Sequence, residues 1–227
     1  MNGFISDTQY VLLPTAYLPP LEYMVWLYAS KKAVVELHET YQRQTWRNRC
    51  SIYAANGRLD LIIPVDRPDG NSTKTCFVKT SKHTNWPIKH WRSITAAYNN
   101  APFFIYYKDL LEPFYRHSSN HNLWEFNMLL LKSITDELSI NTHITRTSSY
   151  ESRPEKITDL RAFLTPKSHR RSISQSFSWP TYHQTFAEKH GFIPNLSIVD
   201  LLFHMGPDTM GYLKDVSCSL LNHPSEG

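Results

Sequence analysis

Apolar positions near the start of the chain follow first a strand-like and then a helix-like spacing. Residues 9–13 form a β-branched apolar run that ends at Pro14, which predicts a buried strand. The next segment opens with Pro19 and Pro20, and its apolar residues then recur at helical spacing. Residues 33–37 predict a second strand. This strand–helix–strand order is typical of a βαβ unit and favours a parallel sheet.

The rest of the chain predicts one hairpin and several further helices. Asn56 and Gly57 lie between two alternating apolar runs, which is the strongest short-range pattern for a β-hairpin. Apolar spacing predicts helices over 86–98, 109–117, 123–138, 156–164, 198–205 and 210–213, and strands over 103–107 and 141–147. The expected fold class is α/β, with a mostly parallel sheet flanked by helices, an added β-hairpin and a helical C-terminal part.

The chain divides into three segments on this pattern. Residues 1–150 are expected to form the α/β core, and residues 36–50 within it carry the polar signature of a ligand edge. Residues 151–181 are rich in serine, proline and basic residues, which predicts an extended or mobile excursion, most flexible over 166–178. Residues 182–227 are expected to complete the same domain with helices.

Glycine spacing and net charge exclude several classes of function. None of the 7 glycines is placed in a GxGxxG or GxxxxGK pattern, so dinucleotide-binding and Walker-type phosphate loops are excluded. The net charge of +4 gives little support to nucleic-acid binding. We therefore expect a partner other than DNA or RNA.

The compartment is expected to be the cytoplasm. The first residues lack a basic region and Asp7 interrupts the apolar run, so a secretory signal is not expected. No apolar stretch approaches the roughly 18–20 residues of a membrane-spanning helix. The 3 cysteines form neither a disulfide framework nor a CxxC pair.

Metal chemistry is weakly supported although the chain holds 11 histidines. His117 and His121 have the i, i+4 spacing of helical zinc ligands, but they lie in a turn-like segment without a third ligand nearby. No metal site is therefore predicted, and the sequence identifies no cofactor.

The densest polar chemistry lies in residues 36–50, directly after the second predicted strand. Ligands bind at the carboxyl ends of parallel strands, where this segment is expected. The candidate acid/base residues are His38 and Glu39, and the candidate substrate-binding residues are Tyr41, Arg43, Gln44, Trp46, Asn48 and Arg49. Arginine forks hold phosphate or carboxylate, and aromatic faces stack on a base or sugar. The alternative is an amphipathic surface strand whose charges are merely solvated.

His90 is a second candidate acid/base residue, on the predicted helix 86–98. His38 is preferred because the end of a strand holds a side chain rigidly, and Glu36 two residues earlier is placed to orient its imidazole. The first βαβ junction, with its proline-started helix, resembles nucleotidyltransferase folds at the level of fold alone, and such folds bind phosphate at a helix N-terminus.

Several segments together resemble one bacterial family. The stretch YLPPLEYMVWLYASKKAVVELHETYQRQTWRNRC, the ANGRLDLIIPV hairpin, HWRSITAAYNNAPFFIYYKDLLEPFY and NLSIVDLLFHMGP resemble the WbqC-like protein family, in particular its Bacteroidetes-type members. The family takes its name from O-antigen gene clusters. The resemblance implies a role near surface-polysaccharide or amino-sugar biosynthesis, and it leaves the reaction open.

Two functions remain open on the sequence alone. The first is a transferase that acts on an activated or nucleotide-linked sugar as its small-molecule substrate. The second is a non-catalytic binding or assembly protein of the polysaccharide machinery, which would use the aromatic residues of segment 98–124. Whether the chain is an enzyme, and its oligomeric state, are left open.

Overall fold

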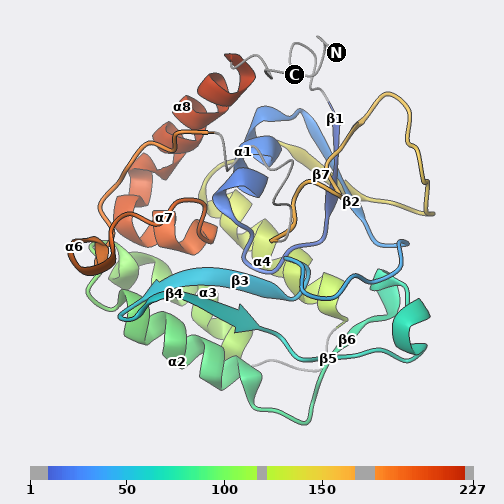
Figure 1. Cartoon of the computed structure of the whole chain (residues 1–227), viewed down its shortest axis with the longest axis horizontal. Coiled ribbons are helices and arrows are strands. Elements are labelled where there is room, and N and C mark those ends of the chain that lie inside the picture. Colours follow the sequence, from blue (N-terminus) through green and yellow to red (C-terminus); the bar gives the residue numbers. More distant parts are fainter. Residues whose placement is uncertain (1–9, 117–121, 167–176, 223–227) are drawn as a thin grey trace.

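The main sheet consists of four parallel strands in the computed structural model, which describes residues 10–116, 122–166 and 177–222 (Figure 1). Their order is β7-β2-β1-β8, formed by β1 (Tyr10–Pro14), β2 (Lys32–Glu36), β7 (His143–Arg146) and β8 (Thr158–Asp159). β1 and β2 pair from Tyr10↔Lys32 to Pro14↔Glu36. The predicted βαβ unit and the mostly parallel sheet are thus confirmed.

The hairpin forms a sheet of its own beside the parallel sheet. Strands β3 (Arg49–Ala54) and β4 (Gly57–Ile62) pair antiparallel, and Gly57 has a φ of 94° directly after the turn. A short antiparallel pair, β5 (Val65–Asp66) and β6 (Lys79–Thr80), follows it. The predicted hairpin is therefore confirmed.

Helices flank the sheets and make up most of the C-terminal part. They are α1 (Leu21–Ala29), α2 (Trp86–Tyr98), α3 (Phe104–Arg116), α4 (Leu123–Glu137), α6 (Ala187–His190), α7 (Ile198–Met205) and α8 (Thr209–Asn222). Figure 1 shows α8 lying along α1, so the last helix covers the first. The Tyr98 hydroxyl links α2, β3 and α7, because it accepts from the amide of Tyr53 (3.1 Å) and donates to Asp200 (2.8 Å).

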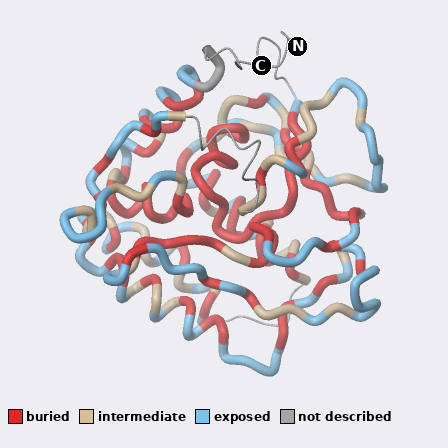
Figure 2. The backbone as a smooth tube through the Cα atoms, viewed as in Figure 1, coloured by how far each residue is buried: buried red, intermediate tan, exposed pale blue. Residues whose placement is uncertain are grey.

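One apolar core joins these elements. Alternate residues of the strands, including Val11, Leu13 and Ala33, point into this core. Helices α1 and α7 lie almost wholly buried within it (Figure 2). Leu160, Leu164 and Trp179 are buried as well. The segment on either side of residues 167–176 therefore contributes to the core.

Two element predictions were wrong. Residues 103–107 were expected as a strand but begin α3, in which Phe104, Leu111 and Tyr115 form the buried face. Residues 156–164 were expected as a helix but contain β8, a strand of 2 residues that pairs with Val11 and Leu12 of β1. Most of the segment 166–178, expected to be flexible, lies outside the described residues.

Neither a spanning helix nor a metal-binding cluster is found in the part of the chain that the structure describes. No helix there is long and apolar enough to cross a membrane. No group of three or more His, Cys, Asp or Glu side chains there is arranged to hold a metal ion. His117 and His121 both fall outside the described residues.

Candidate functional site

A buried polar network lies where the parallel strands end. Glu36, the last residue of β2, is 1% exposed and accepts from the amide of His38 (2.6 Å) and the hydroxyl of Thr147 (3.1 Å). Its second oxygen binds Arg161 (3.1 Å), which also binds the carboxylate of Asp159 (2.6 Å) at the end of β8. Residues from the ends of β2, β7 and β8 are thus held together at the carboxyl edge of the sheet.

The segment that follows Glu36 is a loop with successive turns, not a strand. Its best-buried charged side chain is Arg47, which is 1% exposed and donates from Nε to Glu39 Oε1 (2.9 Å). A second contact joins Arg47 Nη2 to the same oxygen. Burial raises the pKa of Glu39, and the neighbouring guanidinium of Arg47 opposes that shift. The candidate acid/base residue Glu39 is therefore held in an ion pair inside the loop.

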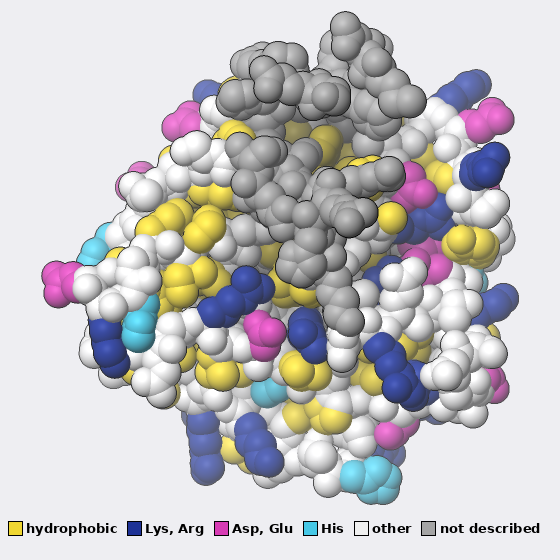
Figure 3. Space-filling view, viewed as in Figure 1, with side chains coloured by type: hydrophobic (Ala, Val, Ile, Leu, Met, Phe, Trp, Pro, Cys, Tyr) yellow, Lys and Arg dark blue, Asp and Glu magenta, His cyan; other side chains and the backbone are white. Residues whose placement is uncertain are grey.

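Tyr41 lies among positive charges. Burial raises the pKa of its phenol to about 12, and four arginines oppose the shift: Arg47, Arg67, Arg49 and Arg43. Lysine and arginine side chains also gather around the hairpin on the face shown in Figure 3, with fewer acidic side chains among them. This arginine cluster creates a local field that favours an anion.

Four buried polar atoms next to this cluster have no hydrogen-bond partner among the described residues. They are Arg47 Nη1, Arg49 Nε, Asn48 Oδ1 and Asn127 Oδ1. Asn127 of α4 reaches the same place, because its amide donates to the carbonyl of Arg47 (2.8 Å) and to the hydroxyl of Thr15 (3.2 Å) after β1. Unpaired buried donors and acceptors are costly, so their concentration here indicates a place for a ligand or ordered water.

Asn48 and Trp46 also hold the loop in place. The Asn48 amide donates to the carbonyl of Ile63 (2.8 Å), which closes the open end of the hairpin. The carbonyl of Trp46 accepts from the amide of Tyr17 (2.8 Å) after β1, and the guanidinium of Arg58 lies 5.9 Å from the centre of the Trp46 ring. Both residues therefore have structural roles, besides the binding roles that the sequence predicts.

Arg43 and Gln44 lie at the exposed turn of the loop. Arg43 donates to the Asn71 side chain (3.3 Å), and Arg67 donates to the same oxygen (3.0 Å). Gln44 is exposed and has a φ of 57°. Asn71 thus brings Arg43 and Arg67 together, whereas Gln44 is placed by the turn and points to no partner among the described residues.

His90 lies inside an aromatic cluster. Its Nδ1 is 3.0 Å from the hydroxyl of Tyr17, and its ring meets that of Trp86 edge-on at 5.1 Å. Burial lowers the pKa of His90 to about 4, and the Ile62 backbone opposes that shift. His90 is therefore neutral at neutral pH. His38, in contrast, is half-buried at the end of β2, and no hydrogen bond of its imidazole is found within the described residues.

The N-terminus of α1 is occupied by the protein itself. The amide of Leu21 donates to the carbonyl of Leu196 (2.9 Å), and the amide of Glu22 donates to the side chain of Asn195 (2.8 Å). Two amides that a phosphate would need are thus already bonded, so the expectation of an anion site at this helix end was wrong.

The structure brings together Glu39, Tyr41, Asn48 and Arg49 with their neighbour Arg47, and it places His90 in the core. Sequence reasoning did not nominate Arg47, Arg67, Arg161 or Asn127. Arg47 is the first residue of the RNR motif at 47–49, and this motif was the one sequence feature that pointed to it. Arg161 lies in a segment that was expected to be helical, and nothing in the sequence marks Arg67 or Asn127.

Fold and site together define an α/β protein whose candidate ligand edge lies at the carboxyl ends of parallel strands and is rich in arginine. The profile of the WbqC-like protein family matches residues 15–174 and 169–212, so the chain belongs to this family. A relative in Mycobacterium tuberculosis (strain ATCC 25618 / H37Rv), named uncharacterized protein Rv1507c, is 26% identical over 194 residues, which cover 77% of this chain and 84% of the relative. No solved structure matches the chain.

Proposed function

We propose that the chain binds the phosphate-bearing part of an activated sugar beside residues 41–49 and transfers a group to or from it. The substrate class is a nucleotide-linked sugar, and the setting is the biosynthesis of surface polysaccharide. The setting rests on the family, which is named after O-antigen gene clusters. The substrate class rests on the charges of the site.

The observation that carries this proposal is a pair of arginines, Arg47 and Arg49, that each have a buried donor atom without a hydrogen-bond partner among the described residues. The two atoms are Arg47 Nη1 and Arg49 Nε. Among the described residues, Arg49 meets one carboxylate, that of Asp60, at 3.6 Å. Diphosphate oxygens accept hydrogen bonds from such donors and balance their charge. A ligand of this kind would supply hydrogen-bond acceptors for the unused donors of both arginines.

His38 is the proposed proton acceptor. The bond from its amide to Glu36 fixes its backbone, and its half-buried ring is accessible at the carboxyl edge of the sheet. Histidine exchanges a proton near neutral pH without a large perturbation. Glu39 and His90, the other candidates, are engaged with Arg47 and Tyr17.

Calorimetric titration of the full chain with uridine diphosphate N-acetylglucosamine tests the binding step, with free N-acetylglucosamine as the comparison. Arg49→Lys keeps the charge but loses the planar fork, so affinity should fall by about 1.5–3 kcal/mol while the fold survives. Arg116→Lys is the matched control, because Arg116 is an exposed arginine paired with Glu112 on α3. Equal affinity of Arg49→Lys and Arg116→Lys, or unfolding of Arg49→Lys, would assign Arg49 a structural role.

A non-catalytic assembly role is the second candidate. It is favoured by the exposed apolar residues of α3, where Ile105 is 59% and Tyr106 is 75% exposed. Large exposed side chains of this type are typical of protein contacts. A chain that binds the nucleotide-linked sugar but shows no turnover with candidate acceptors would support this role over the transferase.

A further inference from the structure

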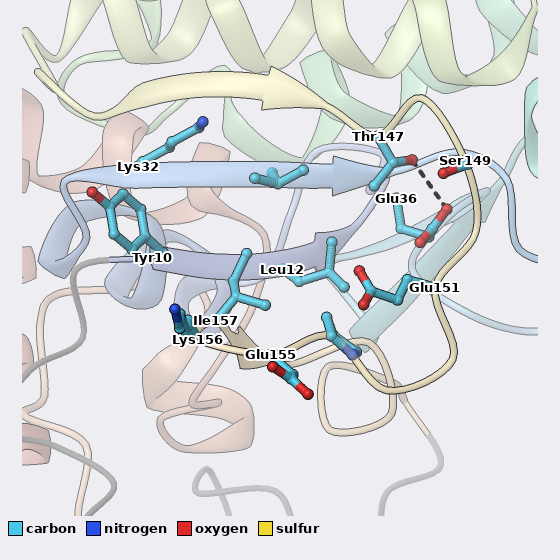
Figure 4. Close-up of a pocket in the computed structure, with 12 residues that line it drawn as sticks. Tyr10, Leu12, Lys32, Glu36, Thr147, Ser149, Glu151, Glu155, Lys156 and Ile157 are labelled. Atoms are coloured by element: carbon cyan, nitrogen blue, oxygen red, sulfur yellow. Dashed lines mark hydrogen bonds between the residues drawn. The ribbon is translucent and has the colours of Figure 1, made fainter.

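The parallel sheet has one face that the core does not use. Val11, Leu13 and Ala33 point into the core, so the residues between them point the other way. Leu12 of β1 and Val34 of β2 lie on this second face (Figure 4). In Figure 4 the segment that joins β7 to β8 runs along the border of this face.

This second face carries a hollow of about 380 Å³, which we call the sheet-face hollow. Its floor is aliphatic and includes Leu12, Val34 and Ile157. Hydroxyl groups of Tyr10, Thr147 and Ser149 stand around it. Its volume lies within the range of small-molecule sites, and an apolar floor with a few polar groups is typical of them.

The charged residues that line the sheet-face hollow are Lys32, Glu36, Glu151, Glu155 and Lys156. Figure 4 shows the carboxylates of Glu36 and Glu151 at the end where β1 and β2 stop, and Lys32 and Tyr10 at the opposite end. Lys32 and Glu36 are four residues apart on one strand, so their backbones are separated by about 13 Å. In Figure 4 the side chain of Glu36 turns toward Thr147, to which it is hydrogen-bonded, and the carboxylate of Glu151 faces the hollow.

The acidic end combines a fixed carboxylate with a free one. Glu36 is held by Thr147 (3.1 Å) and Arg161 (3.1 Å), so its position is set by the protein. Glu151 is exposed and forms no ion pair with any described residue. Lys32 at the basic end is half-buried, and it too forms no ion pair with a described residue. Both unpaired groups are therefore available to a ligand.

We propose that the sheet-face hollow binds a small zwitterion with an aliphatic middle. Its ammonium group lies at Glu151, its anionic group lies at Lys32, and its methylene groups lie on Leu12 and Val34. A ligand with a single charge would leave either Glu151 or Lys32 without a counter-charge. The hollow shares Glu36 with the polar network at the carboxyl edge of the sheet, but none of residues 41–49 lines it.

Calorimetric titration of the full chain with 6-aminohexanoate, hexanoate and 1-aminohexane tests the proposal. The three probes share one aliphatic body and differ only in which charged group is present. We expect saturable binding of 6-aminohexanoate and at least tenfold weaker binding of the other two. Equal affinity for all three, or no saturable binding of 6-aminohexanoate, would overturn the proposal.

Two variants locate the ends of the ligand. Glu151→Gln should lower the affinity for 6-aminohexanoate about tenfold and leave the affinity for hexanoate unchanged. Lys32→Gln should lower the affinities for 6-aminohexanoate and hexanoate and leave that for 1-aminohexane unchanged. Glu188→Gln is the matched control, because Glu188 is exposed on α6 and does not line the hollow. A loss of affinity in Glu188→Gln as large as in Glu151→Gln would refute the assignment. Arg49→Lys should leave this binding unchanged, so the outcome is separate from that of the proposed function.

Discussion

Arg47 and Glu39 form an ion pair whose side chains are only 1% and 7% exposed. The two residues are eight positions apart in a loop, and their contact folds the signature segment onto itself. A buried pair of this kind depends on both partners, because either charge alone has no counter-charge in the protein interior.

Arg47→Met should therefore lower the free energy of unfolding by about 3–5 kcal/mol, since it leaves Glu39 buried without its counter-charge. Urea unfolding followed by circular dichroism measures this change. The double variant Arg47→Met/Glu39→Leu removes both charges and should recover most of the loss. If the double variant is as unstable as the sum of the single variants, the pair is not coupled as the geometry indicates.

The buried neutral His90 should make stability depend on acid pH. Its pKa is about 4 in the folded chain, below the ordinary value of 6.5. The stability associated with this shift is present above pH 6.5 and is lost as pH falls toward 4, because the unfolded chain then binds the proton first. The expected loss is about 3 kcal/mol, from 1.36 kcal/mol per pKa unit.

Unfolding free energies of wild type and His90→Gln between pH 7 and pH 4 check this expectation. The unfolding free energy should change less with pH in His90→Gln than in wild type. Part of the remaining change should come from His204, whose pKa is also lowered by burial. His83→Gln, at an exposed position, should keep the wild-type slope. Identical slopes in His90→Gln and wild type would show that His90 does not control the acid sensitivity.

His38→Gln should lower the turnover of the proposed transferase activity, because it removes the proposed proton acceptor. The expected cost is about 10²–10⁴ in rate, the usual share of general acid–base catalysis. His143→Gln serves as the control, because His143 is exposed at the start of β7, beside Lys32 at the amino end of the strands, whereas His38 follows their carboxyl end. Near-normal turnover of His38→Gln, or a larger loss in His90→Gln, would contradict the assignment.

Gly206→Ala should destabilise the chain by about 2–4 kcal/mol. Gly206 has a φ of 55°, which costs an alanine about 1–2 kcal/mol, and a Cβ there would lie 2.6 Å from Cγ of Phe103. Thermal unfolding measures the effect. Gly70→Ala provides the comparison, because its φ of 57° is similar but no atom lies within 4 Å of the added Cβ. If both variants lose the same stability, the contact with Phe103 contributes nothing.

The sequence was sufficient for elements with a regular apolar period and insufficient for those set by distant contacts. Helix α2 was predicted at its observed bounds, Trp86–Tyr98, because its buried positions recur at helical spacing. β8 was missed because a strand of 2 residues carries no period of its own and exists only by pairing with β1. The aromatic run that starts α3 was misassigned because Ile105 and Tyr106 are apolar but exposed.

The sequence does not specify how residues 36–50 are arranged. An alternating strand would have put Glu39, Arg43 and Arg47 on one face together. In the structure, turns bury Arg47 and expose Arg43, so the two arginines lie in different environments. No local pattern specifies this difference, because it depends on contacts between the loop and Asn127 on α4 and Tyr17 after β1.

The contacts at the start of α1 have a consequence for how the chain folds as it is made. The hydroxyl of Ser197 donates to the carbonyl of Leu18, 179 residues earlier, beside the bond between Leu21 and Leu196. Pairings between such distant residues slow folding because a long loop must close before they form. The first βαβ unit therefore emerges from the ribosome long before the segment around Leu196 and Ser197 has been synthesised. The apolar surface of α1 stays uncovered during that interval, so the growing chain is more prone to aggregation than the finished fold.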